Sequence, residues 1–296
     1  MKNPLFYRIS QFIGFLLGAR VFVAFLLTFA LYVSIFFLFN REESLRNFVF
    51  DFRVHGIVFC TILSILAGGI INQFYDREKD KITKPFRTRF QSFLKQKYFL
   101  YAYLVLNLVS LTIAFIISPR VFFFFLIYQF LMWFYSHKLS KVLVINNLTF
   151  VTLTVYPFFG MWVYYKTFSE KIFLMAVFLF IILLMIDIIK DLLTKNADKI
   201  FNYRTLPNSY GNKLTTVFLS VLSVILLAIS MLIINEEGIH NMMNLYFTAG
   251  LFVIIFTLYL ILNPKKKTIF FAMSILRIWV FTGIFAMLFD GIIKRF

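Results

Sequence analysis

Acidic residues are few in this chain, and two short stretches hold several of the 13. The first stretch reads Asn72-Gln-Phe-Tyr-Asp76-Arg-Glu-Lys-Asp80. In a helix, the spacing of four residues places Asn72, Asp76 and Asp80 on one face. Oxygen ligands that converge in this way suit Mg²⁺, which typically binds through a few carboxylates together with substrate phosphates. The first stretch is therefore a candidate metal–phosphate site.

A second stretch, much further along the chain, repeats the pattern. It contains Asp187, Asp191, Thr194 and Asp198, and the spacing again places these side chains on one helix face. The alternative is that each stretch holds solvated charges that pair with neighbouring Lys and Arg residues. Two similar stretches at the ends of apolar segments favour a functional site, because ionisable groups beside a membrane span are usually functional.

The composition excludes a soluble enzyme and predicts an all-α integral membrane protein. Of the 296 residues, 61% are hydrophobic and 15% are charged, and the mean hydropathy is +0.86. The single cysteine, Cys60, excludes an internal disulfide and a multi-cysteine metal site, and the three histidines lack metal-ligand spacing. The net charge of +17 indicates basic loops beside anionic lipid or an anionic substrate, and not a nucleic-acid groove.

Nine apolar segments meet or approach the length of about 20 residues that a transmembrane helix requires. They cover residues 21–40, 56–74, 98–117, 121–135, 142–165, 171–189, 214–234, 244–262 and 269–289. Because these runs are uninterrupted and do not alternate, they predict helices and not barrel strands. The short linker Ser118-Pro119-Arg120 predicts a tight helical hairpin, and residues 5–20 predict an amphipathic helix at the membrane interface.

The basic residues predict the orientation. Most of the 30 Lys and Arg residues lie at the N-terminus and in the loops after the second, fourth, sixth and eighth segments. By the positive-inside rule, the N-terminus and these loops face the cytoplasm. Both acidic stretches follow even-numbered segments, so the sequence predicts a multi-pass protein of the cytoplasmic membrane with its candidate site at the cytoplasmic face.

Further motifs surround the acidic residues. The first stretch is followed by Lys84-Pro85-x-Arg87, the second reads Ile188-Ile189-Lys190-Asp191 through Asp198 and ends at Thr205-Leu206-Pro207, and a basic loop between them reads Tyr135-Ser136-x-Lys138-x2-Lys141. In this order the motifs resemble those of the UbiA-type intramembrane prenyltransferases. The resemblance spans the whole nine-segment plan. It implies about nine transmembrane helices in two four-helix halves around a central cavity, as a single domain over residues 1–296.

The resemblance also implies a reaction, the Mg²⁺-dependent transfer of a prenyl group from an isoprenyl diphosphate to a lipophilic acceptor. The second motif is most similar to the branch that prenylates geranylgeranylglyceryl phosphate. Aromatic acceptors (a hydroxybenzoate or a naphthoate) and haem are the alternatives. A membrane transporter and an inactive family member that acts as a binding subunit are alternatives from other classes. The expected partners are the two substrates and membrane lipid, with no nucleic acid and no obligate protein partner.

The resemblance assigns the site residues in three groups. The metal ligands are Asn72, Asp76, Asp80, Asp191 and Asp198; the catalytic residues are the four aspartates with Tyr135 and Lys190; and the diphosphate-binding residues are Asn72, Arg87, Lys138, Lys141 and Arg204. By contrast, Lys84 and Lys199 are expected to face solvent or lipid. Arg20 is expected to pair with another residue or to extend to the membrane surface, and Asn147 to line the cavity or to hydrogen-bond a second helix.

Four positions depart from the family pattern. Gln73 and Thr194 stand where an acid is usual, Thr88 stands where a proline often follows the arginine, and Asn202 replaces a usual glycine. The four matching aspartates are expected to hold metal, although the departures leave open a lower metal affinity or a loss of activity.

Overall fold

The computed structural model describes residues 4–39, 44–235, 241–263 and 265–295, and every regular element in these ranges is a helix. The chain forms two compact units, the first from Met1–Tyr32 and Glu42–Ser140 and the second from Val33–Arg41 and Lys141–Phe296. The prediction of an all-α protein is confirmed. Whether the two units act as one domain stays a prediction.

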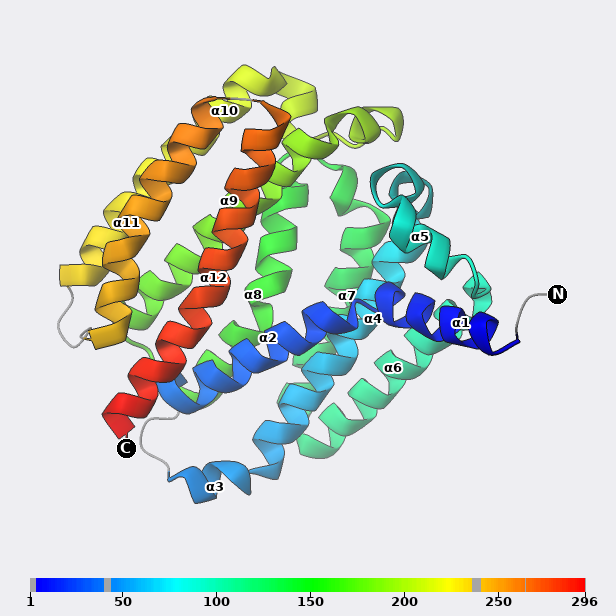
Figure 1. Cartoon of the computed structure of the whole chain (residues 1–296). Coiled ribbons are helices and arrows are strands. Elements are labelled where there is room, and N and C mark those ends of the chain that lie inside the picture. Colours follow the sequence, from blue (N-terminus) through cyan, green and yellow to red (C-terminus); the bar gives the residue numbers. More distant parts are fainter. Residues whose placement is uncertain (1–3, 40–43, 236–240, 264, 296) are drawn as a thin grey trace. The chain divides into compact units, whose positions relative to one another are not determined.

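The first unit is organised around one long helix. Its helices are α1 (Pro4–Gly18), most of α2 (Val21–Ser34), α3 (Leu45–Val49), α4 (Phe52–Thr83), α5 (Pro85–Gln91), α6 (Gln96–Ile117) and α7 (Pro119–His137). Helix α4 packs against both α6 and α7, and α1 packs against α5 (Figure 1). Ala19, Ile70 and Phe99 form a buried cluster that joins the end of α1 to α4 and α6.

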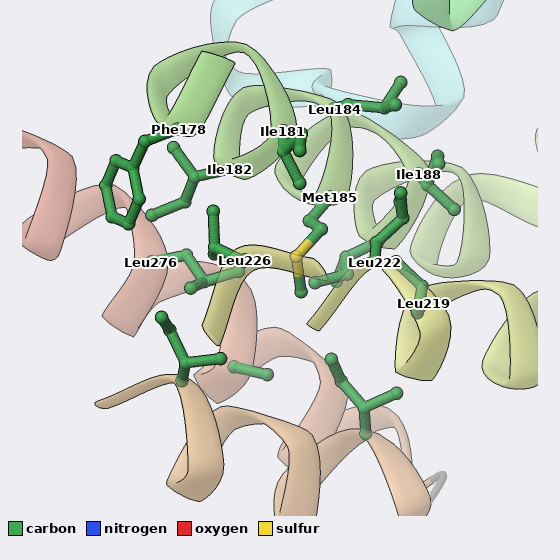
Figure 2. Close-up of a cluster of buried hydrophobic side chains, with 14 of the residues drawn as sticks. Phe178, Ile181, Ile182, Leu184, Met185, Ile188, Leu219, Leu222, Leu226 and Leu276 are labelled. Carbon is green, nitrogen blue, oxygen red and sulfur yellow. The ribbon is translucent and has the colours of Figure 1, made fainter. Parts of the chain in front are cut away.

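The second unit contains the larger apolar core. Its elements are the π-helical turn η1 (Ile35–Phe39), α8 (Ile145–Tyr165), α9 (Glu170–Ile200), α10 (Leu206–Asn235), α11 (Asn241–Leu262) and α12 (Lys266–Arg295); the 3₁₀ turn η2 (Leu139–Lys141) leads into it. Helix α9 packs against α8, α10 and α12. In Figure 2, Met185 of α9 points toward Leu222 and Leu226 of α10, and Leu276 of α12 lies on the same side. This apolar packing holds α9, the helix that contains the second acidic stretch, against α10 and α12.

Local sequence signals explain where several helices begin. Ser118 accepts a hydrogen bond from the backbone N–H of Val121. Pro119 occupies the first turn of α7, where a backbone N–H would have no partner within the helix. This confirms the predicted tight hairpin between α6 and α7. Asp51 caps α4 in the same way, because its carboxylate accepts from the backbone N–H groups of Arg53 and Val54.

Eight helices in the described residues are long and apolar enough to cross a membrane: α2 with η1, α4, α6 and α8–α12. The remaining predicted segment forms α7, whose 19 residues fall outside these eight. Residue 40, at the end of the first predicted segment, lies outside the described residues. The predicted amphipathic helix over residues 5–20 forms as α1, with Leu5 and Phe12 each 64% exposed. Its place at the membrane interface stays a prediction.

The acidic stretches do not lie in loops. The predicted segment 56–74 extends to Thr83 as α4, and the segment 171–189 extends to Ile200 as α9. Hydropathy falls where the charged residues begin, but Lys, Arg, Glu and Leu are good helix formers, so both helices continue beyond the apolar run. Both acidic stretches therefore lie within the C-terminal parts of long helices.

The corner between α1 and α5 permits a stability prediction. A Cβ atom at Gly14 would lie 2.4 Å from the backbone oxygen of Phe90, which cannot move away as a flexible side chain could. We expect Gly14→Ala to destabilise the protein by ~1–3 kcal/mol, the usual cost of overpacking, and to lower the Tm measured in detergent. In Gly250→Ala the new Cβ would meet Trp279 at 3.4 Å, so this control should leave Tm nearly unchanged. Equal Tm values for the two variants would contradict the prediction.

Candidate active site

The first acidic stretch lies along one face near the end of α4. The amide Nδ2 of Asn72 donates to Oδ2 of Asp76. One turn further on, Asp80 is only 2% exposed; its Oδ1 lies 2.8 Å from Lys84 Nζ, and its Oδ2 has no hydrogen-bond partner among the described residues. The predicted helix face is therefore present. A buried carboxylate oxygen without a donor is available to a cation.

Three cations accompany these two carboxylates. Arg20 donates from Nη2 to Oδ1 of Asn72 (3.1 Å), Lys84 pairs with Asp80, and Arg87 donates from Nη2 to the backbone oxygen of Gly18 (3.5 Å). Burial, reinforced by the charge of Arg20, lowers the pKa of Arg87 to about 10, so its guanidinium remains charged at neutral pH. Burial also lowers the pKa of Lys84, against the attraction of Asp80. The cluster carries an excess of positive charge, which suits an anionic ligand.

Lys84, which was expected to face solvent or lipid, has a side chain that is 44% exposed and also forms an ion pair with Asp80. Lys84 lies one helical turn after Asp80, and side chains four residues apart on a helix are neighbours. Asn72, which was predicted as a metal ligand, has an amide oxygen that accepts a hydrogen bond from Arg20. A metal ion at that oxygen would have to displace the guanidinium, so the role of Asn72 as a metal ligand stays a prediction.

Arg20 reaches Asn72 because the α1–α2 corner packs tightly against α4. Arg20 itself adopts a left-handed backbone conformation, with φ of 54°. A Cβ atom at Gly69 would lie 2.8 Å from the backbone oxygen of Ala19, and one at Gly18 would lie 2.4 Å from Oε1 of Gln73. These glycines allow the close approach. The expectation that Arg20 pairs is confirmed, whereas its partner, 52 residues away, could not be named from the sequence.

The second acidic stretch is buried and tied to another helix. Asp187 and Asp191, one turn apart on α9, are each 4% exposed. The amide Nδ2 of Asn147, on α8, donates to Oδ2 of Asp187 (2.8 Å) and to Oδ2 of Asp191 (2.9 Å). Asn146 Nδ2 lies 3.5 Å from the same oxygen of Asp191. Asn147 thus hydrogen-bonds a second helix, one of its two expected roles.

Other side chains complete this region of the second unit. Lys190 forms an ion pair with Oδ1 of Asp187 and lies 5.1 Å from the ring centre of Phe150. Thr194 donates to Oδ2 of Asp198, which is fully buried, at 2.6 Å. Thr194, where the family usually has an acid, therefore acts here as a donor to the next acid.

The other basic residues predicted to bind diphosphate lie after α7 and after α9. The backbone N–H of Arg204 donates to the oxygen of Lys141 (3.2 Å), and Lys141 Nζ lies 5.4 Å from the ring centre of Tyr203. The predicted diphosphate-binding residues Lys141 and Arg204 are thereby brought together. Tyr135 is half-buried on α7, and Lys138 is exposed just after that helix.

The side-chain oxygens in these clusters are possible ligands of a metal ion. In the described ranges, no three His, Cys, Asp or Glu side chains gather closely enough to hold a metal by themselves. Mg²⁺ does not require such a cage, since it binds through one or two carboxylates, waters and substrate phosphates. The available groups are all oxygens, and Oδ2 of Asp80 is buried without a partner. The residues therefore fit Mg²⁺ that is bound together with a phosphate-bearing ligand.

The helices of membrane length define an integral, multi-pass membrane protein. Buried carboxylates lie near the ends of two of these helices, α4 and α9, with lysines beside them. Residues 44–281 match the model of the UbiA prenyltransferase family. The chain belongs to this family, and it is an enzyme of the prenyltransferase class.

Relatives and solved structures agree with this assignment. The chain is 27% identical over 211 residues to digeranylgeranylglyceryl phosphate synthase of Methanosphaera stadtmanae, covering 70% of this chain and 76% of that protein. It is 28% identical over 232 residues to the synthase of Thermococcus sibiricus, covering 77% and 81%. A solved structure described as digeranylgeranylglyceryl phosphate synthase has a TM-score of 0.73 at 19% identity, covering 95% of this chain and 99% of that one. A UbiA homologue from Archaeoglobus fulgidus bound to GPP and Mg²⁺ has a TM-score of 0.66 at 16% identity, covering 93% and 99%. The predicted family and helical membrane fold are confirmed.

Proposed function

We propose that this enzyme transfers a geranylgeranyl group from its diphosphate to geranylgeranylglyceryl phosphate, with Mg²⁺ as the cofactor. The observation that carries the proposal is that each acidic stretch places buried carboxylates, Asp80 in the first and Asp187, Asp191 and Asp198 in the second, beside a lysine near the end of a long helix. The acceptor is inferred from the relatives in Methanosphaera and Thermococcus, which bear the name of the synthase.

The reaction requires cleavage of an allylic carbon–oxygen bond. Its electron pair leaves with the diphosphate, the hydroxyl oxygen of the acceptor forms a new bond to the same carbon, and the hydroxyl proton is released. Bound Mg²⁺ would supply Lewis-acid stabilisation of the charge on the leaving group. Asp76, Asp80, Asp191 and Asp198 are the residues that would hold it.

The cations of the chain stabilise the same developing charge. Groups that are already oriented before the reaction stabilise a transition state more effectively than water, which must reorient. Arg87 is held by the backbone of Gly18, and Lys190 is held by Asp187. We assign diphosphate binding to Arg87, Lys138, Lys141 and Arg204. We add Arg20, which donates a hydrogen bond to Asn72. Tyr135 would hydrogen-bond the phosphate or shield positive charge on the prenyl carbon with its ring.

We further propose that the enzyme lies in the cytoplasmic membrane with both acidic clusters at the cytoplasmic face. The Lys and Arg residues support this orientation, since they are concentrated in the loops on that side.

An acceptor assay tests the proposal. Purified protein in lipid nanodiscs would receive radiolabelled geranylgeranyl diphosphate and Mg²⁺, with geranylgeranylglyceryl phosphate, a hydroxybenzoate, a dihydroxynaphthoate or haem in parallel reactions. We expect label in the diether lipid alone. Label in an aromatic or haem product would contradict the proposed acceptor, and transfer to none of the four by folded protein would contradict catalysis.

A further inference from the structure

Asp187 lies outside the motif residues assigned above, yet it shares a partner with one of them. One amide group, Nδ2 of Asn147, donates to Oδ2 of both Asp187 (2.8 Å) and Asp191 (2.9 Å). An amide NH₂ has two donor hydrogens, so these two bonds use the full donor capacity of Asn147. The amide therefore joins two carboxylates on successive turns of α9.

The amide and both carboxylates are buried, so water cannot replace the hydrogen bonds between them. Asn147 is 2% exposed, and Asp187 and Asp191 are each 4% exposed. Two buried carboxylates one turn apart repel each other, and a donor that serves both offsets that repulsion. Two cations also attract the carboxylate of Asp187. Lys190 forms an ion pair with its Oδ1, and Arg277 of α12 interacts with it electrostatically.

The contacts also divide the two oxygens of Asp191. Oδ2 accepts from Asn147 and lies 3.5 Å from Asn146 Nδ2, whereas Oδ1 has no hydrogen bond within the described residues. The amide therefore fixes the rotation of the carboxylate and leaves one oxygen for a ligand. Groups that orient a metal-binding side chain in this way raise metal affinity.

We propose that Asn147 is a positioning residue that couples Asp187 to Asp191, so that Asp187 contributes to binding of the cation–diphosphate complex through this amide. The proposal rests on the function proposed above. It assigns no contact between Asn147 and the substrate.

The test measures binding of Mn²⁺ as a probe in place of Mg²⁺, by electron paramagnetic resonance, to purified protein that holds geranylgeranyl thiolodiphosphate, a slowly reacting donor analogue. We expect Asn147→Leu to raise the Kd for Mn²⁺ by about 10- to 100-fold, the usual effect of removing such an orienting group. We expect Asp187→Asn to raise it as well. The double variant should be little weaker than Asn147→Leu alone, because coupled residues are not additive.

Gln129→Met is the matched control. Gln129 is also a buried amide, 7% exposed, and it donates to Ser64 at 3.2 Å in the first unit. Both variants remove a buried hydrogen bond between helices, so both should lower Tm, but only Asn147→Leu should weaken Mn²⁺ binding. If Asn147→Leu does not fold, Asn147→Thr replaces it, because its hydroxyl can serve only one carboxylate.

The outcomes separate this inference from the proposed function. Wild-type protein whose Mn²⁺ binding does not depend on the analogue would overturn both. Analogue-dependent binding in the wild type, with equal Kd values for Asn147→Leu and Gln129→Met, would overturn the inference alone. Additive effects of Asn147→Leu and Asp187→Asn would also overturn it.

Discussion

Asp191→Asn should lower kcat for prenyl transfer by about a thousandfold, at the upper end of what the loss of one preorganised charge-stabilising group costs. The substitution keeps the size of the side chain and one oxygen, but it removes the negative charge from a position that is 4% exposed. Since a buried carboxylate is costly in the folded state, Tm should stay the same or rise. Initial rates with radiolabelled geranylgeranyl diphosphate, together with thermal unfolding in detergent, would check both expectations.

Glu78→Gln is the control for that substitution. Glu78 lies within the first acidic stretch, but its side chain is 62% exposed and pairs with Lys81. Exposed pairs of this kind contribute little, so the variant should keep nearly the full rate. An Asp191→Asn enzyme as active as Glu78→Gln would show that the carboxylate takes no part in the reaction.

Removal of divalent cations should have the second large effect. Treatment with EDTA is expected to lower the rate by more than about a hundredfold, because metal ions contribute several kcal/mol to the stabilisation of a developing phosphate charge. Added Mg²⁺ should restore the rate. Because the carboxylates bind the diphosphate only through the cation, the KM for the donor should rise as the cation is removed.

The control for chelation is protein stability. Hydrophobic packing of α9 against α10 and α12 holds the second unit together, so EDTA should change Tm far less than it changes activity. A full rate at complete chelation, verified by metal analysis, would contradict the role of Mg²⁺.

The helices could be predicted because hydropathy and capping are local properties of the sequence. Ser118 and Pro119 marked the hairpin, and the apolar runs marked the spans. Helices α4 and α9 extend beyond the apolar segments 56–74 and 171–189, because a hydropathy boundary marks the edge of the apolar core and not the end of a helix. The charged residues there continue both helices.

The candidate site was predictable only where its contacts follow helix periodicity. Asn72 with Asp76, and Thr194 with Asp198, are pairs four residues apart, and both form hydrogen bonds. The contacts of Arg20 with Asn72 and of Asn147 with Asp187 connect distant segments. Such contacts depend on how helices pack, which a single sequence does not specify.

The acidic residues of each unit are proposed to bind divalent cations together with a donor diphosphate. An experimental structure with Mn²⁺ and geranylgeranyl thiolodiphosphate, with the cations located by anomalous scattering, would show whether they do. We expect a cation within about 2.2 Å, a direct metal–oxygen bond length, of a carboxylate oxygen from Asp76 or Asp80. We expect a second such contact between a cation and a carboxylate oxygen of Asp191 or Asp198. A bound diphosphate whose cations contact none of these four aspartates would contradict the proposed metal site.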